Sequence, residues 1–199
     1  MKTAQAAPVE DEALSDGRRM RSADSRRRIV QALLSLVEEG HLEPGAEAVA
    51  ERAGVGLRSV FRHFKDMEGL RREINEAVET KLRAIIDQPL AGDTPEARLE
   101  ALIDRRADVF EQIMPYRRAG NIQRHRSALI QDKSAEMTRV LRKVLKSVAP
   151  TDLDADLLEA IDLVMSLDSW IRMRVDQGLT PQRAHEVMRR AVRALVRGY

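Results

Sequence analysis

Six arginines and a single aspartate lie between residues 18 and 28 of this 199-residue chain, which has a formal net charge of +2 overall. A basic cluster this compact suits contact with phosphate groups, whose negative charge the guanidinium groups neutralise. A run of charge is also typical of a solvated surface segment, so the cluster by itself leaves both interpretations open. The residues that follow it favour phosphate contact.

The segment from residue 46 to residue 64, AEAVAERAGVGLRSVFRHF, has the pattern of a helix-turn-helix. Small apolar residues on its first helix allow a second helix to cross closely, and Gly54 suits the positive φ of a tight turn. Val60 and Phe64 are expected to anchor the second helix in the core. Such a unit sets a helix into the major groove of DNA. Helical hairpins of ordinary bundles share the pattern, but the exposed side chains favour DNA.

Those exposed side chains have the chemistry of DNA contact. An arginine such as Arg58 can bind a guanine through two hydrogen bonds, which makes it the candidate for base readout. Leu57 suits contact with a thymine methyl group, and Ser59 and His63 suit phosphate. The two remaining candidates are Arg62, for a base or a phosphate, and Arg52, for a phosphate.

The stretch AERAGVGLRSVFRHFKDMEGL, residues 50–70, resembles the TetR family of transcriptional regulators. The chain length and the expected helical layout agree with that family over residues 24–199. The resemblance implies a homodimer in which each subunit places one recognition helix in a half-site of a palindromic operator. It also implies a small-molecule effector that binds the C-terminal domain and releases the DNA, with repression as the default outcome.

Several positions depart from the pattern of that family. Gly56 stands where the family has a capping serine or threonine, and Phe61 where a tyrosine hydroxyl reaches a phosphate. Lys65 is expected to replace a lysine that the family places two residues later. The arginines of residues 18–28 are predicted to compensate for missing phosphate contacts, by entry into the minor groove. The predicted DNA-binding residues are therefore Arg52, Leu57, Arg58, Ser59, Phe61, Arg62, His63 and Lys65.

The elements that position these residues are predicted to be helices throughout. Apolar residues recur at helical spacing, aromatic residues make up only 3% of the chain, and no alternating strand pattern is found. Three regions are expected: a flexible basic arm (1–23), a helix-turn-helix domain (24–70) and a domain for effector binding and dimerisation (71–199). About nine helices are predicted, near residues 24–40, 44–53, 57–64, 66–85, 95–115, 116–122, 127–148, 152–177 and 181–197.

The predicted helix at 152–177 has two apolar faces, of which the second carries Leu163, Leu167 and Trp170. A helix that is apolar on two sides must bury both. This helix and the last one, 181–197, are predicted to form a four-helix dimer interface with the same pair from a second subunit. The alternative is that both faces lie in the core of a large bundle.

Two charged residues fall inside apolar stripes of the C-terminal half, namely Arg106 and Asp168. Burial of either charge alone is costly, so each needs a partner. They are expected either to pair with one another or to line an effector pocket. The predicted ligand-binding residues are Arg106, Phe110, Met137, Met165, Asp168 and Trp170.

Other functions find little support in the sequence. The chain has no cysteine, and it has no zinc-protease motif, phosphate loop or nucleophile elbow, so no catalytic residues, metal or cofactor are expected. The polar first residues and the absence of a long apolar run predict a cytoplasmic protein without a membrane span. An alternative function is a helical protein-interaction module with a vestigial helix-turn-helix.

Overall fold

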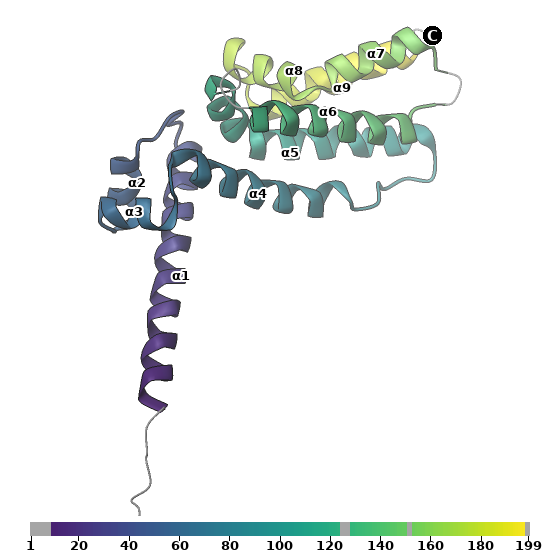
Figure 1. Ribbon diagram of the computed structural model, residues 1–199. Coiled ribbons are helices and arrows are strands. Elements are labelled where there is room, and N and C mark those ends of the chain that lie inside the picture. The colour runs from purple at the N-terminus through teal and green to yellow at the C-terminus, as the bar shows by residue number, and fades with distance from the viewer. Residues whose placement is uncertain (1–8, 124–127, 151–152, 198–199) are drawn as a thin grey trace, which may run out of the picture. The chain divides into compact units, whose positions relative to one another are not determined.

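The computed structural model describes residues 9–123, 128–150 and 153–197, and every regular element in these ranges is a helix (Figure 1). Nine α-helices and one π-helical turn make up the described part, which confirms the all-α prediction. The chain divides into two compact units, residues 1–77 and 78–199. Helix α4 (Met67–Ile86) runs across this boundary and contributes to both units. Within the described ranges, no helix is long and apolar enough to cross a membrane.

The first unit is built on α1 (Val9–Glu38), which packs against α2 (Ala46–Ala53) and α3 (Leu57–His63). The contacts come from the C-terminal half of α1, where apolar residues at spacings of three and four form one stripe. This stripe meets the small face of α2. The buried residues of the unit include Ile29, Ala32, Leu33, Leu36, Val37, Ala46, Val49, Ala50, Ala53, Val60, Phe64, Leu70 and Ile74.

Helix α1 begins at Val9, so the predicted boundary between a flexible arm and a first helix at residue 24 is wrong. Residues 9–23 contain Ala, Leu, Met, Glu and Arg, all strong helix formers, and they continue a helix that is already nucleated by the packed segment after residue 24. The absence of an apolar stripe does not by itself end a helix, because propagation from a packed segment needs only residues that tolerate helical geometry. Residues 1–8 of the predicted arm lie outside the described residues.

The second unit is a helical bundle arranged around α5, which contacts α6, α8 and α9. Threonine caps precede two of its helices. The Thr94 hydroxyl accepts a hydrogen bond from the Ala97 amide at 3.2 Å, and the Thr180 hydroxyl accepts one from the Arg183 amide at 3.2 Å. The elements are α5 (Pro95–Gln123), α6 (Ala128–Val148), α7 (Ala155–Val164), α8 (Leu167–Ile171), the π-helix η1 (Arg172–Asp176) and α9 (Pro181–Arg197).

Helix α5 continues through Pro115, so the predicted interruption there is wrong. A proline inside a helix removes one backbone hydrogen bond and costs about 3 kcal/mol. Tertiary contacts on both sides offset this cost. Phe110 and Ile113 are buried just before the proline, and after it Arg117 donates a hydrogen bond to Ser134 of α6.

The predicted helix at 152–177 is instead interrupted at Met165 and Ser166, which separate α7 from α8, and α8 continues directly into η1. The Ser166 hydroxyl accepts a hydrogen bond from the Ser169 amide at 3.1 Å and so caps the N-terminus of α8. Arg106 donates to the Met165 carbonyl at 2.7 Å, which satisfies an acceptor at the end of α7. Apolar periodicity continues across the break, and for that reason the sequence pattern does not reveal it.

Candidate nucleic-acid interface and ligand-binding core

The turn between α2 and α3 depends on Gly54, as predicted. Its φ of 61° and ψ of 41° are left-handed, and its amide donates to the carbonyls of Ala50 and Glu51 at the end of α2. The next residue, Val55, donates its amide to the Ala50 carbonyl at 3.0 Å. These bonds complete a tight turn that sets the start of α3 against α2.

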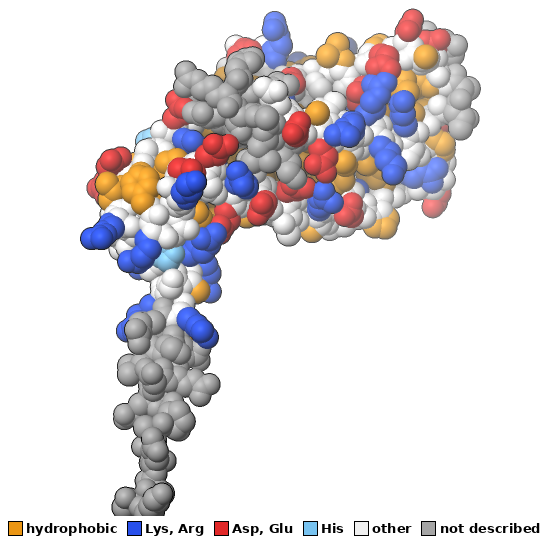
Figure 2. All heavy atoms as spheres, in the orientation of Figure 1, with side chains coloured by type: hydrophobic (Ala, Val, Ile, Leu, Met, Phe, Trp, Pro, Cys, Tyr) orange, Lys and Arg blue, Asp and Glu red, His pale blue; other side chains and the backbone are white. Residues whose placement is uncertain are grey.

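Helix α3 is anchored from one side and exposed on the other. Val60 and Phe64 are 1% and 4% exposed, whereas Leu57 and Phe61 are 38% and 47% exposed. Large apolar side chains that remain this exposed on a short helix suit contact with a partner rather than with water. Figure 2 shows exposed hydrophobic side chains next to Lys and Arg in the region of α2 and α3.

The predicted DNA-binding residues on α3 and directly after it differ in how free their side chains are. Among the described residues, Arg58 and Lys65 are exposed and have no hydrogen-bond or ion-pair partner. Arg62 is exposed and donates to the Ser59 hydroxyl at 3.2 Å. The basic groups on this face are therefore available to phosphates and base edges.

Arg52 is held by an ion pair, and His63 is partly buried. Arg52 forms a two-pronged ion pair with Glu39, at 2.6 and 2.7 Å, which joins α2 to the residues just after α1. His63 is half-buried, and its Nε2 atom is enclosed without a hydrogen-bond partner among the described residues. Burial, with smaller effects of Arg62 and Arg26, lowers the pKa of His63. A neutral imidazole is the expected form near pH 7.

The arginine cluster at residues 18–28 divides into members that bond the helix-turn-helix and its neighbours and members that do not. Arg26 binds Glu73 of α4, donates to the His63 carbonyl at 2.8 Å and lies over the Phe64 ring at 4.4 Å. Arg28 donates to the carbonyls of Ala53 and Gly54 at the end of α2. These two side chains fasten α1 to the helix-turn-helix. Sequence reasoning missed this role, although both residues directly precede the buried stripe of α1.

Arg19, Arg21 and Arg27 are exposed. Arg27 pairs with Asp24 at 3.0 Å, one helical turn away. Arg19 and Arg21 are exposed and have no hydrogen-bond or ion-pair partner within the described part of the chain. The side chain of Arg18 lies outside what the structure describes.

The residues predicted to bind a ligand come together in the core of the second unit, with one exception. Phe110, Met165 and Trp170 are each 1% exposed or less, and Met137 packs against the same core. The Phe110 and Trp170 rings lie 6.5 Å apart at 59°, a tilted aromatic pair. A cavity of about 10 Å³ beside Arg106, lined also by Leu102, Leu141 and Val144, has room for about one water molecule.

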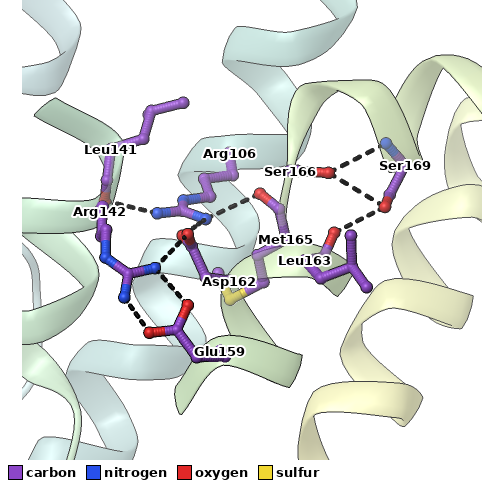
Figure 3. Close-up of polar contacts among 9 residues, drawn as sticks. All are labelled: Arg106, Leu141, Arg142, Glu159, Asp162, Leu163, Met165, Ser166 and Ser169. Carbon is purple, nitrogen blue, oxygen red and sulfur yellow. Dashed lines mark hydrogen bonds and ion pairs between the residues drawn. The ribbon is translucent and has the colours of Figure 1, made fainter. Parts of the chain in front are cut away.

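Arg106 is 2% exposed and is the centre of a buried polar network (Figure 3). Its guanidinium donates to the Met165 carbonyl at 2.7 Å and to the Leu141 carbonyl at 2.6 Å, and it lies 4.0 Å from Asp162. Asp162 in turn pairs with Arg142 at 3.0 Å. Burial lowers the pKa of Arg106 to about 10, so the group still carries its charge at neutral pH.

Asp168 does not pair with Arg106, so that predicted alternative is wrong. Its side chain is 69% exposed, and its ion-pair partner is Arg117 at 3.6 Å. The chain break at Ser166 rotates Asp168 away from the core, into the first turn of α8, where a carboxylate favours the helix N-terminus. Arg106 instead finds Asp162, six residues earlier, as its partner.

A second polar contact in this core, not predicted from the sequence, joins α5 to the π-helical turn. The Trp170 indole donates to Glu111 at 3.1 Å, and Arg174 of η1 holds the same carboxylate with two bonds of 2.9 Å. Hydrogen bonding by Arg174 is the main cause that lowers the pKa of Glu111. Glu111 thereby fixes both the indole and the turn that follows it.

Solved structures of other proteins share this fold. No family model matches the chain, and no curated protein matches it. Solved structures do: a TetR transcription regulator from Haloarcula marismortui superposes with a TM-score of 0.64 at 19% identity, covering 86% of this chain and 98% of that one. A transcriptional regulator from Rhodococcus sp. Rha1 gives a TM-score of 0.66 at 18% identity, covering 87% and 96%. A transcriptional regulator (TerR/AcrR family) from Aquifex aeolicus gives 0.61 at 20% identity, covering 86% and 99%.

The described part of the chain is thus all-helical, with a helix-turn-helix in the first unit and a separate helical core in the second. Its fold is that of the TetR-type transcriptional regulators, as the sequence resemblance predicts.

Proposed function

We propose that this protein is a DNA-binding transcriptional regulator, in its simplest form a cytoplasmic repressor that binds a palindromic operator as a homodimer. The observation that carries this proposal is the exposed face of α3. Arg58 and Arg62 are exposed there beside two exposed apolar side chains, Leu57 and Phe61, while Val60 and Phe64 anchor the helix from beneath. Lys65, just after the helix, is exposed as well. A helix supported in this way can enter the major groove without losing its own packing.

Selection from random duplex DNA with the full chain tests this function. We expect enrichment of a sequence with two-fold symmetry, bound in a mobility-shift assay with an affinity that falls steeply between two salt concentrations. Selection that enriches no sequence, with no retarded band at low salt, would contradict DNA binding. It would leave the chain as a helical interaction module whose helix-turn-helix is vestigial.

Arg58→Ala is expected to weaken binding to the enriched duplex by about 1–3 kcal/mol and to relax base preference at one position in each half-site. Repeating the selection with the variant measures both effects. Lys65→Ala is the matched control, because removing a cation that binds phosphate weakens all sequences alike. If Arg58→Ala instead weakens binding to all DNA sequences equally, Arg58 contacts the phosphate backbone of the DNA and not a base.

We place the dimer interface on α7–α8 and α9. Of the second apolar face predicted for residues 152–177, Leu167 is partly buried and Trp170 is buried within its own unit, whereas Leu163 is 68% exposed. Leu163 of α7 and the 40% exposed Val175 of η1, the turn that continues α8, are the large apolar side chains that this part of the chain leaves to solvent. In a two-fold interface each such residue is buried twice, once from each subunit.

Leu163→Gln is expected to raise the dimer dissociation constant at least about 10-fold, because burying a leucine contributes about 1.5–3 kcal/mol at each of two symmetric positions. Sedimentation equilibrium over a concentration series measures the change. The matched control is Val140→Gln, which alters a 38% exposed residue of α6 outside the proposed interface. If both substitutions change the dimer dissociation constant equally, α7 is not part of the interface.

The effector is proposed to act on the second unit, near Arg106, Phe110, Met137, Met165 and Trp170. The tight packing there means that a ligand larger than water enters only as the core rearranges. The rearranged core is costly without the effector and is stabilised only when the effector is bound. Effector binding therefore shifts the protein toward a second conformation, and we propose that this conformation releases DNA. Loss of the retarded DNA band on addition of individual small molecules tests this step.

A further inference from the structure

Arginines on α1 lie next to the proposed DNA-binding surface of the helix-turn-helix. Residues 9–38 form one helix, so the arginines before residue 26 occupy defined positions relative to α2 and α3 instead of lying on a flexible segment. Seven residues make two turns of a helix, so positions seven apart lie on the same face, about 10 Å apart.

Arg21 lies seven residues before Arg28, and Arg19 lies seven residues before Arg26. Arg28 bonds the carbonyls at the end of α2, and Arg26 bonds the last residue of α3 and Glu73. The faces of α1 that carry Arg19 and Arg21 are therefore the faces that adjoin the helix-turn-helix. Both side chains are exposed and have no polar partner within the described ranges.

From this arrangement we infer that Arg19 and Arg21 bind DNA phosphates and extend the contact surface along α1, beyond the recognition helix. The inference rests on the proposed DNA-binding function. It also revises the expectation that this segment enters the minor groove. An α-helix is about 10–12 Å wide with its side chains, and the minor groove of B-DNA is about 6 Å wide. The helix thus lies outside that groove, and its arginines reach the phosphates at the groove edge.

The charge balance of the surface supports this assignment. Phe61 has no hydroxyl to offer a phosphate, Arg52 is occupied by Glu39, and Arg26 and Arg28 are occupied within the unit. Phosphate neutralisation supplies much of the affinity of DNA-binding proteins. Arg19 and Arg21 supply two further cations in each subunit, without breaking any contact that holds α1 in place.

The decisive experiment compares the double variant Arg19→Ala, Arg21→Ala with the unaltered chain on the duplex enriched by selection. Removing one phosphate contact reduces the slope of log affinity against log salt by about 0.9. Two arginines in each of two subunits are therefore expected to reduce the slope by about 2–4. The matched control is Lys143→Ala with Lys146→Ala, which removes the same charge from exposed positions of α6 and is expected to leave the slope unchanged.

The helical form of the segment is tested by Ala23→Pro. Ala23 is exposed, and proline there breaks the helix between Arg21 and the packed residues while leaving Arg26 and Arg28 in place. We expect this variant to lose as much salt dependence as the double arginine variant. Ethylation interference on the same duplex should identify phosphates that matter for the unaltered chain and for neither variant.

The outcomes separate this inference from the function on which it rests. If the unaltered chain binds no duplex, the proposed function fails. If it binds and the double arginine variant keeps the same slope and the same interference pattern, the phosphate contacts of α1 are refuted. If Ala23→Pro binds like the unaltered chain while the arginine variant is weakened, the segment acts as a flexible arm and the helical placement is refuted.

Discussion

Arg106→Ala is expected to lower the free energy of unfolding of the second unit by about 3–5 kcal/mol. The substitution removes a buried cation that binds two backbone carbonyls and a carboxylate. It leaves the Met165 carbonyl at the end of α7 without its donor, and a buried acceptor without a partner is costly. It also opens a cavity in a core whose adjoining void is only about 10 Å³.

Trp170 fluorescence in a urea titration measures this loss selectively. Trp170 is the one tryptophan in the sequence and lies in the core that Arg106 supports. Arg106→Met should recover part of the stability, because methionine fills space without a charge that must be compensated. Arg139→Ala on α6 is the control, since its side chain is exposed and bonds only its own helix, and a change within about 0.5 kcal/mol is expected. A loss below about 1 kcal/mol for Arg106→Ala would show that the network is not structural.

Gly54→Ala is expected to destabilise the helix-turn-helix by about 2–4 kcal/mol. About 1–2 kcal/mol comes from forcing an L-residue into the left-handed region at φ 61°. The added methyl group would also approach a terminal nitrogen of Arg28 to 2.6 Å and displace the bonds that hold α1 to the end of α2. Hydrogen exchange should show reduced protection of the amides of α2 and α3, and DNA binding should fall with it.

Gly56→Ala provides the matched comparison two residues away. Gly56 has a φ of −69°, and a methyl group added there meets nothing within 4 Å. Only a small change, within about 1 kcal/mol, is expected from replacing glycine at a helix N-cap. Similar losses for both glycines would mean that chain entropy, not the turn geometry, limits stability at this site.

The helix-turn-helix could be predicted in detail because its constraints are local. The small residues of α2, the glycine of the turn and the anchors Val60 and Phe64 lie within nineteen consecutive positions, 46–64, and each follows from helical spacing. The threonine caps before α5 and α9 are equally predictable, since a cap depends on residues three positions apart.

The partners of charged side chains could not be predicted in the same way. Arg26 pairs with Glu73 and Arg106 pairs with Asp162, and the members of each pair are more than forty residues apart in the sequence. Periodicity places a charge on a face of its helix, but it does not say which distant helix meets that face. The pairing of Arg106 with Asp168 is therefore compatible with the sequence, and only the break at Ser166 excludes it.

The sequence alone determined the helical class of the protein, the turn at Gly54 and the exposed and buried sides of α3, because backbone propensity and spacing along one helix decide these features. Only the tertiary structure decided where long helices break or continue. Pro115 is carried inside α5 by contacts on both sides, and the break at Ser166 is satisfied by Arg106 from another helix. It likewise decided which arginines of α1 bond the helix-turn-helix and which do not, since that division depends on carbonyls and carboxylates brought near only when α1 packs.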